Sequence, residues 1–278
     1  MDLDPQLLAI ANEAIAARQP GARQLSFPGW ELPLRAMPAD VARSAVFTAR
    51  PDRDLGLTIT KQIIPCENAV IEYSGPLLNQ SNADVWQTLV FICRVKGRSS
   101  IETRGSTLIR MMREGTASAG KRVQTADREN LRKKIDALSK GQVSVLYNTG
   151  ATAGTHLLSY HRSEDDRYLV EIPSETLKLF WSDLVLINYA VRVLINGQLA
   201  KWLHTYFAAS LDPVLVEKIR NLANCQTKDD SRFRQLVREA LIELIRVKAL
   251  TNADIKNGQV LVSMDPTGVL PKPKRLKP

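Results

Sequence analysis

The chain has 278 residues, of which 44% are hydrophobic and 24% charged, a composition typical of a folded, water-soluble protein with room for two domains. Lys and Arg number 38 against 29 Asp and Glu, so the formal net charge is +9 at pH 7. A surplus of this size favours polyanionic partners such as nucleic acid. No apolar run reaches the roughly 20 residues of a membrane-spanning helix, and the start of the chain is acidic where a signal peptide is basic. We therefore expect a cytoplasmic protein that makes no use of a membrane.

Neither the cysteines nor the histidines are spaced as metal ligands. They form no CxxC motif and no Cys/His pair: Cys66, Cys93, Cys225, His156, His161 and His204. We expect reduced thiols, structural histidines and no bound metal. The hydrolase motifs G-x-S-x-G and H-E-x-x-H are absent from the sequence as well, so the residues predict neither a catalytic site nor a cofactor.

One segment approaches a nucleotide-binding motif. Residues 115–122, GTASAGKR, nearly match the phosphate-binding loop G-x-x-x-x-G-K-[ST]. Arg122 stands where that motif has a magnesium-binding hydroxyl, and the preceding residues 106–114 have a helical pattern rather than that of an apolar strand. A flexible loop is therefore the favoured interpretation, and a P-loop ATPase is the less favoured alternative.

The first part of the chain mixes helices and strands. Asp4-Pro5 starts an amphipathic helix that runs to about Arg18, and residues 20–38 form an arm interrupted by Pro and Gly. Alternating residues rich in Ile, Val and Thr predict strands over 54–64 and 69–75.

A helix over residues 81–95 follows, with Ser81 or Asn82 as its cap and with an apolar face formed by Val85, Leu89 and Ile92. A short strand over 99–105 and a short helix over 106–114 come next.

The pattern then becomes helix followed by hairpin. Leu131, Ile135 and Leu138 form one apolar stripe of a helix over 125–139, which Gly141 ends. Strands are predicted over 142–148 and 155–162, around a turn at 149–154, and over 167–172. Two helices followed by a hairpin is the order of elements in a winged helix.

The second half repeats this order. A long helix over 189–210 has four buried candidates: Leu199, Trp202, Leu203 and Tyr206. A second helix covers 213–225, and a third covers 230–250 with four more: Phe233, Val237, Leu241 and Leu244. A turn at Asn257-Gly258 predicts a small hairpin, or wing.

The predicted fold is therefore α+β, with two tandem winged-helix domains and an extended N-terminal arm. The expected boundaries are 1–38 for the N-terminal helix and arm, 39–180 and 181–265 for the two domains, and 266–278 for a basic, disordered tail.

Two helices share a face that combines basic and polar side chains. With the apolar stripe of 125–139 turned inward, the residues at its start and on its outer side are Lys121, Arg122, Thr125, Arg128, Glu129, Arg132 and Lys133. The helix from Ser231 carries a similar set: Lys228, Ser231, Arg232, Arg234, Gln235, Arg238 and Arg246. Arg pairs with guanine and Gln with adenine through two hydrogen bonds, and nearby cations neutralise phosphates. We expect both helices to bind double-stranded DNA; the simpler alternative is a pair of solvated charged faces.

Several blocks of sequence resemble the TrfA family of bacterial plasmid replication initiators. They are DVWQTLVFICR, STLIRMMREGTASAGKR, ENLRKKIDALSKGQVSV, YLVEIPSETLKLF and QLAKWLHTYFAAS, and the resemblance extends from about Trp30 to about Leu250. It implies two winged-helix domains that bind direct repeats (iterons) at a plasmid origin, promote origin opening and recruit the host initiator DnaA, the replicative helicase and the sliding clamp. It also allows a homodimer. A transcriptional repressor on the same scaffold is the alternative function.

The resemblance also gives the arm a role. TrfA proteins carry a clamp-binding peptide of the form Gln-Leu-Ser/Asp-Leu-Phe at this place. Gln24, Leu25 and Ser26 match it, but Phe27 follows Ser26 directly, so one leucine is missing. Two interpretations stay open, a degenerate clamp ligand and an arm folded onto its own domain, and the large apolar Trp30 favours the second.

Overall fold

The computed structural model describes residues 34–54, 57–65, 69–147, 152–174, 176 and 184–264. The predicted helix 4–18, the clamp peptide 24–27, Trp30 and the tail 266–278 lie outside these ranges. Helices combine with antiparallel sheets, an arrangement compatible with the predicted α+β class. No helix in the described ranges is both long enough and apolar enough to cross a bilayer.

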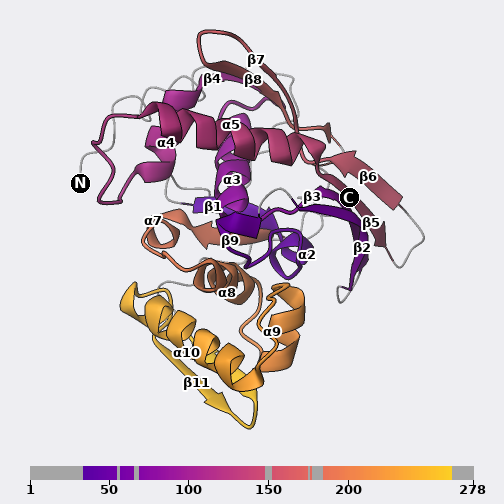
Figure 1. The fold of residues 1–278 in the computed structure, drawn as a ribbon, viewed down its shortest axis with the longest axis vertical. Helices are drawn as coiled ribbons and strands as arrows, with labels where there is room; N and C mark the ends of the chain where they lie inside the picture. The colour runs from indigo at the N-terminus through magenta and orange to yellow at the C-terminus, as the bar shows by residue number, and fades with distance from the viewer. Residues whose placement is uncertain are drawn as a thin grey trace.

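Two bodies, each with its own apolar core, lie one above the other (Figure 1). The upper body, here the first unit, comprises β1 (Leu34–Pro38), α2 (Ala39–Ala42), β2 (Thr58–Pro65), β3 (Ala69–Pro76), α3 (Gln80–Val95), β4 (Ser100–Arg104), α4 (Gly105–Arg113), α5 (Thr125–Lys140), β5 (Gln142–Tyr147), β6 (Thr152–His156), β7 (Ser159–Arg162), β8 (Arg167–Glu171) and β9 (Leu184–Asn188). The lower body, the second unit, comprises α8 (Gln198–Ala209), β10 (Val214–Leu215), α9 (Val216–Leu222), α10 (Asp230–Arg246), β11 (Asn252–Lys256) and β12 (Gln259–Ser263), and α7 (Tyr189–Arg192) connects the two.

Helix α3 is the centre of the first unit. Its predicted apolar face is buried, and the fully buried Trp86 donates its indole N–H to the carbonyl of Leu157. The cap, however, is Asn79 rather than Ser81 or Asn82: its side chain accepts the backbone N–H groups of Ser81 and Asn82, while the Asn82 side chain accepts the N–H of Asn79. The helix therefore begins one residue earlier than predicted.

The strands around α3 form three sheets, in the orders β2-β3-β5-β6, β4-β8-β7 and β1-β9. The prediction of one strand over 155–162 was wrong: β6 pairs with β5, whereas β7 pairs with β8 in another sheet. Leu157 and Leu158 lie between them and are buried, and the N–H of Leu157 bonds to the carbonyl of Gly141. Both leucines enter the core here, which breaks the alternation that a single strand requires.

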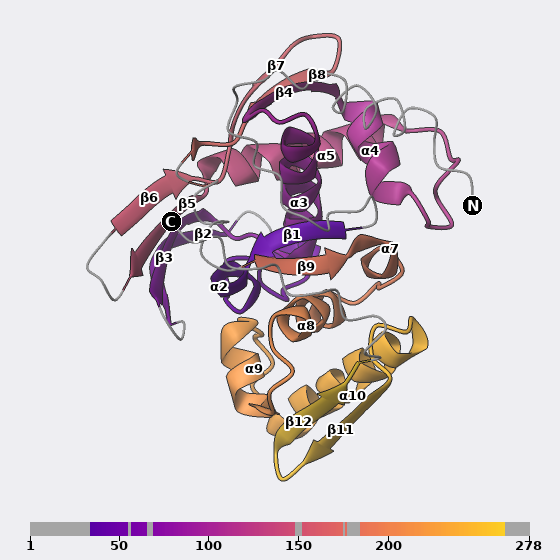
Figure 2. The ribbon, with the colours of Figure 1, turned by 180° about the vertical axis from the view of Figure 1, so that it is seen from behind.

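The end of the predicted arm is part of the core. Residues 34–38 form β1, all five of them are buried, and they pair with β9, a strand that the sequence did not predict. In Figure 2 this two-stranded ribbon lies between α3 and α8. The β1–β9 pair therefore joins the first and the last strand of the first unit, at the boundary with the second unit.

The predicted long helix 189–210 is interrupted. Residues 193–197 separate α7 from α8, because the carboxylate of Glu243 in α10 accepts the backbone N–H groups of Asn196 (2.6 Å) and Gly197 (3.3 Å). The apolar residues on both sides keep a helical spacing, so periodicity alone does not indicate this break. Of the four buried candidates, Leu199 is only half-buried.

The second unit packs α8, α9 and α10 against a three-stranded sheet of order β10-β12-β11. Helix α10 buries all four predicted side chains. At the tip of the β11–β12 hairpin, Asn257 and Gly258 have φ of 50° and 76°, as a two-residue hairpin turn requires. The Asn-Gly turn is therefore confirmed.

A buried guanidinium joins the units. Arg192 has no exposed surface, and all its N–H groups have partners: Asp84 at 2.6 Å and Gln80 from α3, and Thr205 and the Lys201 carbonyl from α8. Lys201 also contacts Asp84 at 2.6 Å. Burial raises the pKa of the Asp84 carboxyl, but Arg192 and Lys201 outweigh this effect and hold the pKa below its ordinary value.

Replacing Arg192 by Met, which keeps a long side chain without the charge, should lower the free energy of unfolding by about 3 kcal/mol or more, because it removes one of the two cations paired with Asp84 and the donor to several buried polar groups. Chemical denaturation measures the loss. Arg246→Met is the control, since its side chain is 65% exposed and lies 3.9 Å from Glu243; we expect a change within about 0.5 kcal/mol there. Equal losses in the two variants would contradict the role given to Arg192.

His204 in α8 should make stability sensitive to mild acid. Burial, with Arg192 nearby, lowers its pKa to about 3, and its Nδ1 has no hydrogen-bond partner among the described residues. The unfolded chain binds a proton near pH 6.5 and the folded chain does not, so stability falls as the pH drops below 6.5, by about 2 kcal/mol at pH 5. This part of the pH dependence should vanish in His204→Gln and persist in His161→Gln, whose histidine is exposed. Denaturation at pH 7 and pH 5 compares them.

Candidate nucleic-acid interface

Helix α5 presents the first predicted face to solvent. Its stripe of Leu131, Ile135 and Leu138 is buried, as predicted. Most of the outward set is exposed: Lys121, Arg122, Thr125, Glu129, Arg132 and Lys133. Arg128 is the exception, because it is half-buried and its Nε lies 3.3 Å from the Asp166 carboxylate. The apolar stripe thus fixes the rotation of α5 and turns this face to solvent.

The cations of this face differ in whether they are already paired with a carboxylate. Both Nε and Nη2 of Arg132 bond to Glu129, at 3.3 and 2.5 Å. The side chains of Lys121, Arg122 and Lys133 make no hydrogen bond or ion pair within the described ranges. These three side chains can meet a phosphate without first giving up a protein partner.

The loop before α5 lacks the setting of a nucleotide-binding loop. Helix α4, not a strand, precedes it, and the segment 114–124 is a series of turns. Asp127 ties the loop to α5: it accepts the backbone N–H of Gln124 at 2.8 Å and pairs with Arg113. The hydrogen bond from Gln124, together with Arg113, lowers the pKa of Asp127, so this carboxylate stays ionised. The loop thus presents Lys121 and Arg122 beside the start of the helix.

Helix α10 presents the second face. Asp229 caps it by accepting the backbone N–H of Arg232 at 2.6 Å. The buried side chains turn all the predicted residues to solvent, and each of them is exposed: Lys228, Ser231, Arg232, Arg234, Gln235 and Arg238. Glu239 engages two of them, since it accepts the Gln235 amide at 3.1 Å and lies 3.9 Å from Arg232. The guanidiniums of Arg234 and Arg238 form no ion pair with any described residue.

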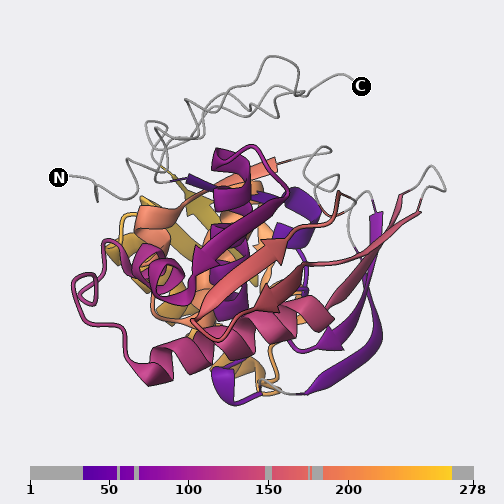
Figure 3. The ribbon, with the colours of Figure 1, turned by 90° about the horizontal axis from the view of Figure 1, so that it is seen from above.

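The two helices lie on the same side of the molecule. In Figure 1 α5 crosses in front of α3 and α10 lies in front of the β11–β12 hairpin, and in Figure 2 both helices are behind these elements. Figure 3, from above, shows α5 along the side of the first unit opposite β1. The structure therefore brings the two predicted faces, far apart in the sequence, to one surface.

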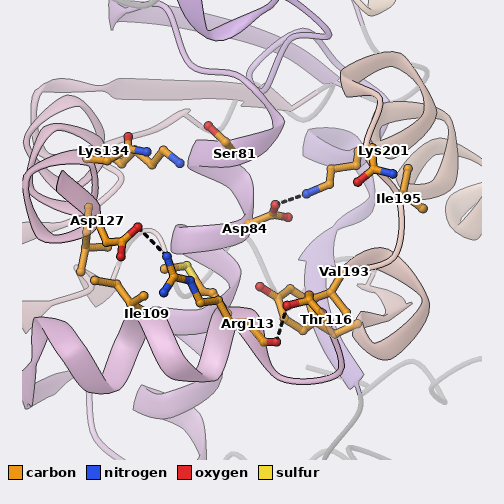
Figure 4. A pocket seen from close by; sticks show the side chains of 15 residues that line it. Ser81, Asp84, Ile109, Arg113, Thr116, Asp127, Lys134, Val193, Ile195 and Lys201 are labelled. Carbon is orange, nitrogen blue, oxygen red and sulfur yellow. Dashed lines mark hydrogen bonds and ion pairs between the residues drawn. The ribbon is translucent and has the colours of Figure 1, made fainter. Parts of the chain in front are cut away.

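Sequence reasoning missed the polar residues between the units. Arg192 stands in the apolar run YAVRVLIN and was assigned to one long helix. Lys134 follows Lys133 in the chain but lies about 100° further round α5. It points toward a cavity that Lys201 and Asp84 also line (Figure 4). A charged residue inside an apolar run was the one signal for Arg192, and nothing in the sequence singled out Lys134.

Comparison with known proteins gives little likeness. No protein-family model matches the chain, and no curated protein matches its sequence. Among solved structures, two crystal structures of domains 2 and 3 of RctB match with a TM-score of 0.48 and 13% identity each. One match, to a selenomethionine derivative, covers 74% of this chain and 85% of the other; the second covers 82% and 97%. At this identity and TM-score the likeness says nothing of what this chain binds.

Replacing Glu239 by Gln should strengthen DNA binding. The change removes a carboxylate from the exposed face of α10 and releases Arg232 and Gln235, so we expect roughly twofold to fivefold tighter binding at low salt. Fluorescence anisotropy with a labelled duplex measures it. Glu217→Gln in α9 makes the same charge change on another helix. If both variants gain equally, the face of α10 has no special part in binding.

Proposed function

We propose that this protein is a site-specific DNA-binding protein that reads one duplex with α5 and α10. The observation that carries the proposal is the pair of exposed basic and polar helix faces on one side of the molecule, with Arg234 and Arg238 free of ion pairs among the described residues. The net charge of +9 supports a polyanionic partner. The helices enter the major groove, where Arg and Gln distinguish base pairs.

The order of elements in the second unit supports a winged-helix assignment. The run α8, β10, α9, α10, β11, β12 has three helices, with a short strand between the first two and a hairpin after the third. In this arrangement α10 is the recognition helix and the β11–β12 hairpin is the wing. Lys256, exposed beside the turn of that hairpin, lies 3.3 Å from Asp254 and would exchange this carboxylate for a phosphate.

The biological role we propose is initiation of plasmid replication. It rests on the sequence resemblance to TrfA initiators. That resemblance implies binding to direct repeats at an origin, opening of the origin, and recruitment of DnaA, the helicase and the clamp. We propose no catalytic activity: strand opening draws on the free energy of binding and of DNA deformation rather than on nucleotide hydrolysis. Origin opening distinguishes this role from the alternative. The proposed initiator would open the origin duplex without hydrolysing a nucleotide, whereas a transcriptional repressor would bind the duplex and leave it closed.

Arg238→Ala tests the proposal. We expect it to weaken binding to DNA from beside the protein's own gene by about 1–3 kcal/mol and to relax sequence choice, because a base contact is lost. Lys121→Ala should instead weaken binding to native and shuffled duplexes alike and reduce the salt dependence. Anisotropy on both duplexes across a salt series measures these effects. Equal losses on the two duplexes for Arg238→Ala would rule out α10 as the base-reading helix.

A further inference from the structure

A cavity of about 350 Å³ lies between the two units. Residues of α3, α4 and α5 line it on one side, and Val193, Ile195, Asn196 and Lys201 line it on the other. Asn196, on its wall, is held by Glu243 of α10. The cavity is therefore bordered by α5 on one side and, on the other, by a segment that hydrogen-bonds to α10.

The charges around this cavity are unbalanced. Its carboxylates are already paired, Asp84 with Arg192 and Lys201, and Asp127 with Arg113 at 2.5 Å. Lys134, by contrast, makes no hydrogen bond or ion pair within the described ranges. Figure 4 shows its ammonium extending from α5 toward the space in front of Asp84, with Lys201 on the far side. Three cations thus line a cavity with two carboxylates, and the guanidinium of Arg192 lies behind one of those.

Lys134 is partly buried, and its ammonium has no hydrogen-bond or ion-pair partner among the described residues. Burial lowers the pKa of Lys134, and Asp52 and Asp84 oppose this only in part. A desolvated cation of this kind is stabilised by an anion that enters the cavity and contacts it directly. Asn130, one turn before Lys134 on α5, lines the same wall and offers an amide donor beside it.

We propose that this cavity binds a phosphate group through Lys134 and Asn130. Both the charge and the volume of the cavity suit a phosphate. The lysine ammonium is a compact point charge that can contact a phosphate oxygen, and the volume leaves room for bridging water. One source is a backbone phosphate of DNA that spans α5 and α10, in which case the site rests on the proposed function. The other source is a free phosphate or a small molecule that carries one.

Two measurements on the full chain separate these sources. Lys134→Gln keeps the length and polarity of the side chain without its charge, and Lys218→Gln on the exposed face of α9 is the charge-matched control. The first measurement is anisotropy across a salt series on native and shuffled duplexes. The second is thermal unfolding in inorganic phosphate against chloride of equal ionic strength.

If a DNA phosphate occupies the site, Lys134→Gln lowers the slope of log K against log salt by about 0.9 while the preference for native over shuffled DNA is kept, and Lys218→Gln leaves the slope unchanged. If a free phosphate is the ligand, inorganic phosphate raises the unfolding temperature of the wild type and of Lys218→Gln but not of Lys134→Gln. A general salt effect on stability raises all three equally.

The proposal is overturned if Lys134→Gln changes neither the salt slope nor the response to phosphate. Failure of the proposed function is a separate result: the wild type then binds native and shuffled DNA equally, and the phosphate measurement alone decides the site. Loss of fold does not obscure the outcome, because the unfolding temperature in chloride reports it directly.

Discussion

The contact between the two units of this molecule is built around one buried guanidinium, that of Arg192. All the N–H groups of Arg192 bond to residues of α3 and α8, and Arg192 and Lys201 together outweigh burial and hold the pKa of Asp84 below its ordinary value. Because α5 packs on α3 and α10 on α8, this contact contributes to the relative orientation of the two helices that we propose face DNA. Without Arg192, Asp84 would keep Lys201 alone, and the buried acceptors of Gln80, Lys201 and Thr205 would lose their donor.

An ordered connection between the units would favour the proposed function, in which one protein reads two stretches of one duplex. Two recognition helices on a flexible tether lose conformational freedom when both engage, and that loss subtracts from affinity. Here the tether is already ordered: Asn196 and Gly197 are held by Glu243, and Trp202 donates its indole N–H to the carbonyl of Ser44 across the boundary. The spacing between α5 and α10 is thus a property of the free protein, and under the proposed function DNA whose sites are spaced differently would have to bend or twist to contact both helices.

Local patterns predicted well wherever one helix face or one turn decided the outcome. The apolar stripe of α5, that of α10 and the Asn257-Gly258 turn all followed from spacing and turn chemistry. Prediction failed where a residue far away in the sequence determines the local structure. The break before α8 depends on Glu243 from another helix, β1 becomes a strand only because β9 pairs with it, and Lys134 acquires its setting from residues of the second unit. None of these partners is near in sequence, so no local window contains them.

The pairing of β1 with β9 also sets the order in which a ribosome can build this protein. Leu34 pairs with Asn188, and Leu184 and Ile187 of β9 complete the core around α3. At about 5–20 residues per second, the chain from residue 39 on keeps β1 without its partner for on the order of 10 s. During this time β1, whose five residues are all buried in the finished fold, has an unpaired strand edge. The first unit therefore closes only when β9, a segment made after nearly all of it, pairs with β1.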